Sequence, residues 1–225
     1  MGDFSLFDAI AVLWFLACWN IYVRVADRGT QAHRSMTGVM SAYRLRWMRQ
    51  MVKRENRIVD TSIVGNQLNG AAFFASTAIL LTGGLFALLG STEQAIAVLG
   101  HLPFIEAPSR ALWEMKVLLL IVIFIYAFFK FAWSFRLFNY CSILLGAVPV
   151  TPADETETEK ELIRIARVNA LGAEHFNNGM RAYFFSLATL GWFIHPAFFM
   201  MASAWVVFVL YRREFRSRSL KAVCD

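Results

Sequence analysis

The 225-residue chain is 58% hydrophobic and only 17% charged, and its mean hydropathy is +0.50. Soluble domains carry roughly 25% charged residues, and a domain of this size cannot hide so much apolar surface from water. The composition excludes an ordinary soluble protein and predicts an integral membrane protein. The net charge of +6 comes from basic blocks beside apolar segments, so we expect anionic lipids as partners and no nucleic acid.

The first apolar run, 6–23, has the length needed to cross a bilayer. The segment that follows, 24–57, carries nine Arg and Lys residues against two acids. Apolar residues recur in it at helical spacing: Met36, Met40, Tyr43, Trp47 and Met51. This pattern predicts an amphipathic helix over about 34–57, lying either on the membrane surface or against the rest of the protein.

A second span is expected at about 68–89, after capping side chains at 60–62. Small residues recur on one face of this span: Ala72, Ser76, Gly83 and Ala87. Such a face lets helices approach closely in lipid, where the hydrophobic effect does not drive their association. We predict a helix-packing face within the chain; an interface between copies or a pore lining is the alternative.

The third span is predicted at 113–135, where Lys116 and Lys130 can extend toward opposite interfaces. The apolar stretch 137–148 either extends this helix or runs along the surface. Thr151 and Pro152, followed by acids, form a typical helix start and predict a helix over about 152–180 outside the bilayer.

The last apolar run, 183–211, is interrupted near its middle by His195–Pro196. Two arrangements fit it: one tilted, kinked span, or a hairpin folded at His195–Pro196. The loops 24–57, 91–112 and 136–182 contain nine, one and five Arg and Lys residues, which places the N-terminus outside and the first loop in the cytoplasm. A single span would put the five basic residues of 212–225 outside, against this rule. We favour the single span because the basic first loop dominates the topology.

The predicted fold is therefore an all-α, polytopic transmembrane helical bundle forming one membrane domain over 1–225. It has about four spans and two amphipathic cytoplasmic helices. The spans are 6–23, 68–89, 113–135 and 183–211, and the cytoplasmic helices are 34–57 and 152–180. We expect a multi-pass protein of the cell inner (plasma) membrane.

Polar residues gather at the entrance to the last run. His175, Asn177, Asn178 and Arg181 precede it, and Asn66 and Asn69 lie at the matching end of the second span. We predict that the two groups meet on the cytoplasmic side, where their amide, imidazole and guanidinium groups could bind an anionic headgroup or ligand. Capping of helix ends and mutual hydrogen bonding is the alternative. His195 is a further candidate, as a ligand-binding residue or as a histidine bonded to a neighbouring carbonyl.

The sequence gives no support for catalysis. There is no nucleophile elbow, no Walker-type glycine loop and no HExxH pattern. The three cysteines lack the spacing of a disulfide framework or a zinc site, and only His195 is deep in a predicted span, which disfavours a bis-histidine haem. We therefore expect no catalytic residue, no metal and no cofactor.

The sequence resembles a family of bacterial and plant four-helix membrane proteins of unknown function. The matching stretches are Ser41–Met48, Phe73–Thr77, Gly83–Gly84, Phe176–Phe199 and Leu210–Phe215. The resemblance implies the architecture but brings no reaction, cofactor or binding residue.

Three functions fit these patterns. We favour a homo-oligomeric channel- or transport-type protein, because of the small-residue face and the broken last run. The absence of a mid-span Asp or Glu disfavours ion-coupled transport. The alternative is a structural or accessory membrane protein that binds anionic lipid or a partner complex through its basic helix. A redox or membrane enzyme is the third.

Overall fold

The computed structural model describes residues 5–28, 34–100, 109–150 and 154–224. Its elements in chain order are α1 (Leu6–Arg28), α2 (Met36–Met51), α3 (Ile58–Gly90), α4 (Thr92–Gly100), α5 (Arg110–Ala147), α6 (Glu155–Leu190), the 3₁₀ helix η2 (Gly191–Phe193), α7 (Pro196–Phe215) and α8 (Arg218–Cys224). No strand occurs in these ranges. The all-α prediction is confirmed.

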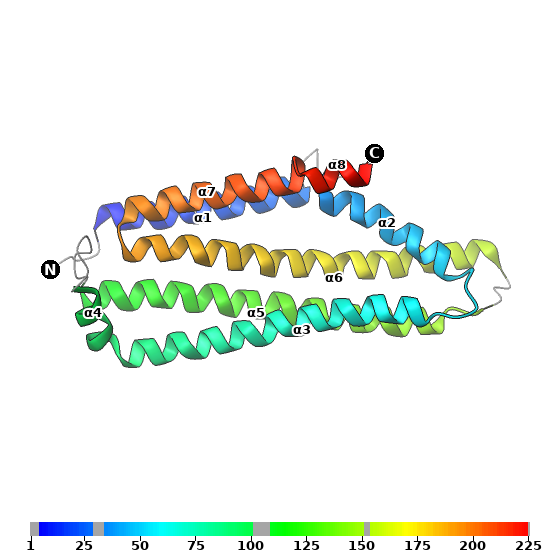
Figure 1. Ribbon diagram of the computed structural model, residues 1–225, viewed down its shortest axis with the longest axis horizontal. Helices are drawn as coiled ribbons and strands as arrows, with labels where there is room; N and C mark the ends of the chain where they lie inside the picture. The colour runs from blue at the N-terminus through cyan, green and yellow to red at the C-terminus, as the bar shows by residue number, and fades with distance from the viewer. Residues whose placement is uncertain (1–4, 29–33, 101–108, 151–153, 225) are drawn as a thin grey trace.

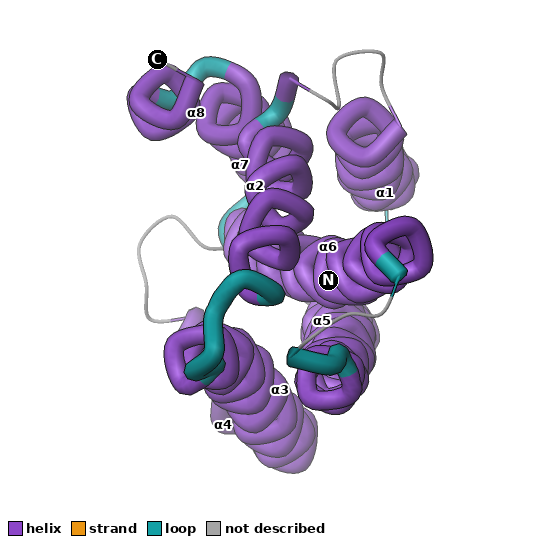
Figure 2. Tube along the Cα trace, turned by 90° about the vertical axis from the view of Figure 1, so that its right-hand side faces the viewer, coloured by secondary structure: helices purple, strands orange, loops and turns teal. Residues whose placement is uncertain are grey.

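The long helices lie along one common axis: the neighbouring pairs α3–α5, α5–α6 and α6–α7 are antiparallel, whereas α1 and α7 run side by side in the same direction (Figure 1). α6 lies in the middle of the bundle, with α5 and then α3 on one side and the α1–α7 pair on the other (Figure 2). One end holds the start of α1, the short helix α4 and η2; we call it the α4 end. The other half of the bundle holds α2, with α8 beside the start of α2, and we call it the α2 end (Figure 1).

Three helices are long and apolar enough to cross a membrane: α1, α3 and α5. They contain the expected spans 6–23, 68–89 and 113–135. The apolar piece 137–148 extends α5, which has 38 residues and a length of roughly 57 Å. Because about 20 residues suffice to cross a bilayer, α3 and α5 both project well beyond one.

The described part of the bundle has two large hydrophobic cores and a small third one around Trp113, Val117 and Ile121 of α5. The core nearer the α4 end is aromatic and contains the fully buried Phe15, Phe131, Phe185, Trp192 and Phe199. The core at the α2 end lies beneath α2, where Met48 and Met51 pack with residues such as Val64, Phe138 and Ile165. The amphipathic α2 thus packs on its own protein.

The helix expected at 152–180 and the beginning of the span expected at 183–211 belong to one continuous helix. No Pro lies in this region, and α6 continues without interruption from Glu155 to Leu190. Asp154 caps its start by accepting from the backbone N–H groups of Thr156 and Glu157, at 2.7 and 3.3 Å. The start expected at Thr151–Pro152 falls outside the described residues.

Of the two arrangements considered for 183–211, the structure has the hairpin and not the favoured single kinked span, because the chain reverses direction at 191–195. Trp192 stacks on Phe199 beside the turn, with ring centroids 5.3 Å apart. Further from the turn, the Arg213 guanidinium lies 5.6 Å from the centroid of the Phe184 ring. α6 and α7 therefore form an antiparallel hairpin, and the basic tail returns to the α2 end (Figure 1).

Local chemistry explains the reversal. His195 adopts an extended backbone, which a following proline favours, and Pro196 occupies the first turn of α7, where its missing N–H costs nothing. The Nδ1 atom of His195 accepts from the Ala197 N–H at 3.1 Å and so caps α7. Pro196 starts a new helix instead of kinking a continuous one.

Candidate functional site

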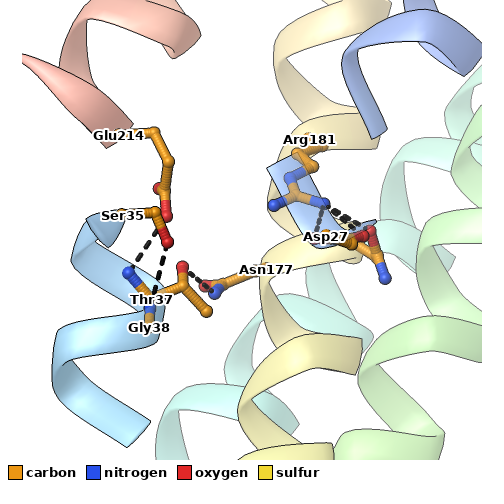
Figure 3. A network of polar contacts seen from close by, with 8 residues as sticks. Asp27, Ser35, Thr37, Gly38, Asn177, Arg181 and Glu214 are labelled. Carbon is orange, nitrogen blue, oxygen red and sulfur yellow. Dashed lines mark hydrogen bonds and ion pairs between the residues drawn. The ribbon is translucent and has the colours of Figure 1, made fainter. Parts of the chain in front are cut away.

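A buried ion pair joins α1 to α6 near the α2 end. The Nη1 atom of Arg181 lies 2.8 Å from each carboxylate oxygen of Asp27 and 2.9 Å from Asn178 Oδ1 (Figure 3). The side chains of Arg181 and Asp27 are 5% and 18% exposed. Asn178 and Arg181 meet because residues three apart share a helix face. Arg181 also lies over the Tyr22 ring, 5.4 Å from its centroid.

The first turn of α2 is tied to the same place. Asn177 donates from Nδ2 to the Thr37 hydroxyl at 3.2 Å, and the Thr37 N–H donates to Glu214 Oε1 at 3.0 Å (Figure 3). Ser35 caps α2 by accepting from the Gly38 N–H at 3.0 Å. The Glu214 carboxylate faces the positive end of the α2 dipole, which stabilises the contact between α7 and α2.

Two hollows flank this network. One, of about 400 Å³, is lined by Asp27, Arg44, Arg167 and Glu174 among others, so its charges balance. The second, which we call the tail cavity, has a volume of about 340 Å³ and lies between α6 and the end of α7. Its polar lining comprises Tyr22, Asn177, Arg181, Arg213, Glu214, Ser217 and Ser219. The tail cavity therefore combines two guanidinium groups with one carboxylate, three hydroxyls and an amide.

A second polar cluster links α2, α3 and α6 further toward the α2 end. The buried Asn169 accepts from Arg44 Nε at 2.9 Å and donates to Gln67 Oε1 at 2.8 Å. Burial lowers the pKa of the Arg44 guanidinium, although an arginine stays protonated. This cluster is satisfied internally and fixes the position of α2.

The structure brings together only part of the predicted polar group. Asn177, Asn178 and Arg181 all belong to the network around Asp27 and Thr37. Asn66 and Asn69 are exposed on α3 and make no hydrogen bond to any described residue, whereas Gln67 between them reaches Asn169.

His175 points away from that network, toward α5. Its ring lies 6.4 Å from that of Trp133, and its buried Nδ1 atom has no hydrogen-bond partner among the described residues. Burial lowers the pKa of His175, and the nearby Lys130 ammonium acts in the same direction. The imidazole is therefore neutral at neutral pH.

His195 lies at the opposite, α4 end of the bundle, where it is exposed beside Phe7. A charged cluster lies near it. The Asp8 carboxylate accepts from Trp192 Nε1 at 2.7 Å, and Lys116 Nζ lies 5.7 Å from the centroid of the Trp192 ring. Asp8 and Lys116 are both buried, so Lys116 does not extend to an interface as the sequence predicts.

The small residues of α3 face away from the neighbouring helices. Ala72 is half-buried, and Ser76, Gly83 and Ala87 are exposed, whereas α3 packs on α5 through a different face. A Cβ atom added at Gly83 would have no heavy atom within 4 Å.

Sequence reasoning missed Asp27, Thr37 and Glu214, which are the partners of the predicted polar residues. Only the hairpin brings Glu214 to the α2 end. The signal that could have revealed it is the basic tail: with a hairpin, all three basic segments lie at one end of the bundle, as the distribution of Arg and Lys favours.

The described residues contain no group of three His, Cys, Asp or Glu side chains that could hold a metal ion. Fold and site together define an all-helical protein with three helices suited to crossing a membrane and a buried polar network toward one end. Over residues 10–219 the chain matches a family described as protein of unknown function, DUF599, and it belongs to that family. No curated protein and no solved structure matches it.

Proposed function

We propose that this protein is an accessory membrane protein that gathers anionic lipids around the α2 end. The observation that carries the proposal is the distribution of charge. The helices bearing the basic residues of 24–57, 136–182 and 212–225 reach the α2 end, whereas the segment 91–112 toward the α4 end contains one Arg. From the positive-inside rule we propose that the α2 end lies in the cytoplasm and the N-terminus outside, with the protein in the cell inner membrane.

Exposed cations at this end support the proposal further. Arg46, Lys53, Arg212 and Arg216 are exposed, and none of them forms an ion pair with a described residue. Each basic residue near an anionic membrane surface contributes about 1 kcal/mol of attraction. Several such residues at the α2 end attract anionic lipid headgroups to the protein.

Lipid analysis tests this function. The full-length protein would be extracted into polymer-bounded discs, and the lipids around it compared with those of the bulk membrane. We expect enrichment of anionic lipids, which falls when Arg46, Lys53 and Arg212 are changed to Gln. The matched control replaces the uncharged exposed residues Gln50, Ser62 and Asn66 with Ala. A lipid composition equal to the bulk membrane would overturn the proposal.

A second candidate function, a homo-oligomeric channel or transporter, is favoured by one observation. The small-residue face of α3 is available to another copy, since no described helix covers Ser76, Gly83 or Ala87. Substituting Leu for Gly83 should then convert an oligomer into a monomer in size-exclusion chromatography. Protein-dependent flux across liposomes is also required, and its absence for ions and small solutes would argue against transport.

A further inference from the structure

An apolar groove continues from the tail cavity along the outside of the α6–α7 hairpin. It has a volume of about 300 Å³ and an almost wholly apolar lining from both helices: Phe184, Leu187, Ala188, Ala202, Trp205, Val206, Val209 and Leu210. Phe184 and Leu210 line the tail cavity as well. The two hollows are therefore adjacent, the polar one at the α2 end and the apolar one toward the α4 end.

The groove lies within the apolar part of the hairpin. Leu187 and Trp205 are 61% and 65% exposed, so the groove opens toward the surroundings of the bundle and away from its core. A membrane protein presents such a surface to acyl chains.

The cations at the junction differ in their availability. Arg181 is bound to Asp27 and Asn178, and Glu214 accepts from the Thr37 N–H, so these groups are held by the protein. Arg213 forms no ion pair with a described residue and is exposed, with its guanidinium over Phe184 where the two hollows meet. The hydroxyls of Ser217 and Ser219 line the same cavity. Arg213 can therefore receive a phosphate, and the two serines can donate to it.

Each hollow is at the lower end of the size range of ligand pockets, and the two differ in chemistry. We infer that together they bind one anionic phospholipid molecule. Its phosphate lies against Arg213, Ser217 and Ser219, and one acyl chain lies in the groove between α6 and α7. The inference rests on the proposed recruitment of anionic lipids and assigns a defined lipid site to it.

Native mass spectrometry of the full-length protein in mild detergent tests the site, with phosphatidylglycerol or phosphatidylcholine added. We expect one phosphatidylglycerol retained per chain and phosphatidylcholine retained on the order of tenfold more weakly, because its choline cation cancels the charge of the phosphate and is repelled by Arg181 and Arg213. R213Q should reduce phosphatidylglycerol retention on the order of tenfold, whereas R110Q, at an exposed arginine of the α4 end, should leave retention close to wild type.

A matched pair of variants tests the apolar half of the site, the groove between α6 and α7. Ala202 lines the groove, and A202F fills it, whereas the exposed Ala204 lies outside the groove and A204F serves as control. We expect A202F to weaken retention of the lipid and A204F to leave it unchanged. Glycerol phosphate, the soluble headgroup alone, should not compete.

The outcomes separate the site from the general function. Equal losses in R213Q and R110Q, with anionic preference retained, would overturn the site and leave the proposed function intact. Equal retention of both lipids by the wild type would overturn both. Competition by glycerol phosphate, or insensitivity to A202F, would mean that the acyl groove is not part of the site and would contradict the inference.

Discussion

Arg181 on α6 and Asp27 on α1 form a buried ion pair in which one guanidinium nitrogen lies 2.8 Å from both carboxylate oxygens. The pair lies where α1 ends and where the chain from α1 leads into α2. It holds the end of α1 on the central helix α6, and the bond between Asn177 and Thr37 ties the start of α2 to the same helix.

We expect D27N to destabilise the protein strongly. Removing one charge of a buried pair leaves the other uncompensated, which costs about 3–5 kcal/mol. Equilibrium unfolding in mixed micelles measures the change. E174Q, at an exposed acid on α6, is the control and should cost little. A D27N protein as stable as E174Q would show that the pair contributes nothing to stability.

The packing of α5 on α6 depends on two glycines. A Cβ atom added at Gly179 would lie 2.6 Å from the Phe131 ring, and one added at Gly172 would lie 2.7 Å from the Phe138 ring. We expect G179A and G172A to destabilise the protein by about 1–3 kcal/mol, because neither buried ring can move freely. G83A meets open space and should be neutral or stabilising by about 0.5–1 kcal/mol from helix propensity. Equal effects of G179A and G83A in the same unfolding assay would contradict the α5–α6 interface.

Trp192 fastens the turn of the hairpin to α1 through Asp8. W192F removes the indole donor and leaves a buried carboxylate oxygen unsatisfied, at a cost of about 1–3 kcal/mol. W205F, at an exposed tryptophan of α7, makes the same chemical change without that bond and should cost much less. The difference between the two unfolding free energies is the measurement, and a difference near zero would remove the structural role of the bond.

Because His175 is buried as a neutral imidazole, we expect the free energy of unfolding to fall in acid. Its pKa in the folded protein lies below its ordinary value of 6.5, so the unfolded chain takes up a proton that the folded protein does not. The stability contributed by the neutral imidazole is present above pH 6.5 and is lost as the pH falls toward the lowered pKa. H175Q should flatten the unfolding free energy below pH 6.5, and K130M should flatten it in part. Identical pH profiles for wild type and H175Q would contradict the burial of a neutral imidazole.

The sequence was sufficient to predict three of the long helices from their apolar runs, although α3 and α5 extend well beyond those runs. The runs 6–23, 68–89 and 113–135 are continuous and apolar, and each lies within one long helix. The turn at 191–195 could not be predicted in the same way, because Pro196 can either kink a helix or begin one. Trp192 stacks on Phe199 across this turn. Such a contact between residues on either side of the turn cannot be inferred from a local sequence pattern.

The candidate site was likewise only partly predictable, because its contacts join residues that are far apart in the sequence. Arg181 and its neighbouring amides are conspicuous in the sequence because they directly precede an apolar run. Their acidic partner, Asp27, lies 154 residues away, and Glu214 reaches α2 only through the hairpin. Asn66 and Asn69 carry the same amide side chain as the asparagines of the site, but they face outward. The helical register of α3 turns Gln67 inward instead.

The lipid site and the gathering of basic charge both depend on the hairpin, which alone brings Arg213 and Glu214 beside α2. Cross-linking in the membrane tests this directly, with cysteines introduced at Thr37 and Glu214 in a background in which Cys18, Cys141 and Cys224 are replaced. Because the Thr37 N–H lies 3.0 Å from Glu214 Oε1, a short bifunctional thiol reagent should join the two positions efficiently within one chain. A single kinked span would put positions 37 and 214 on opposite sides of the membrane. Absence of the cross-link, while each cysteine alone still reacts with a maleimide, would contradict the hairpin.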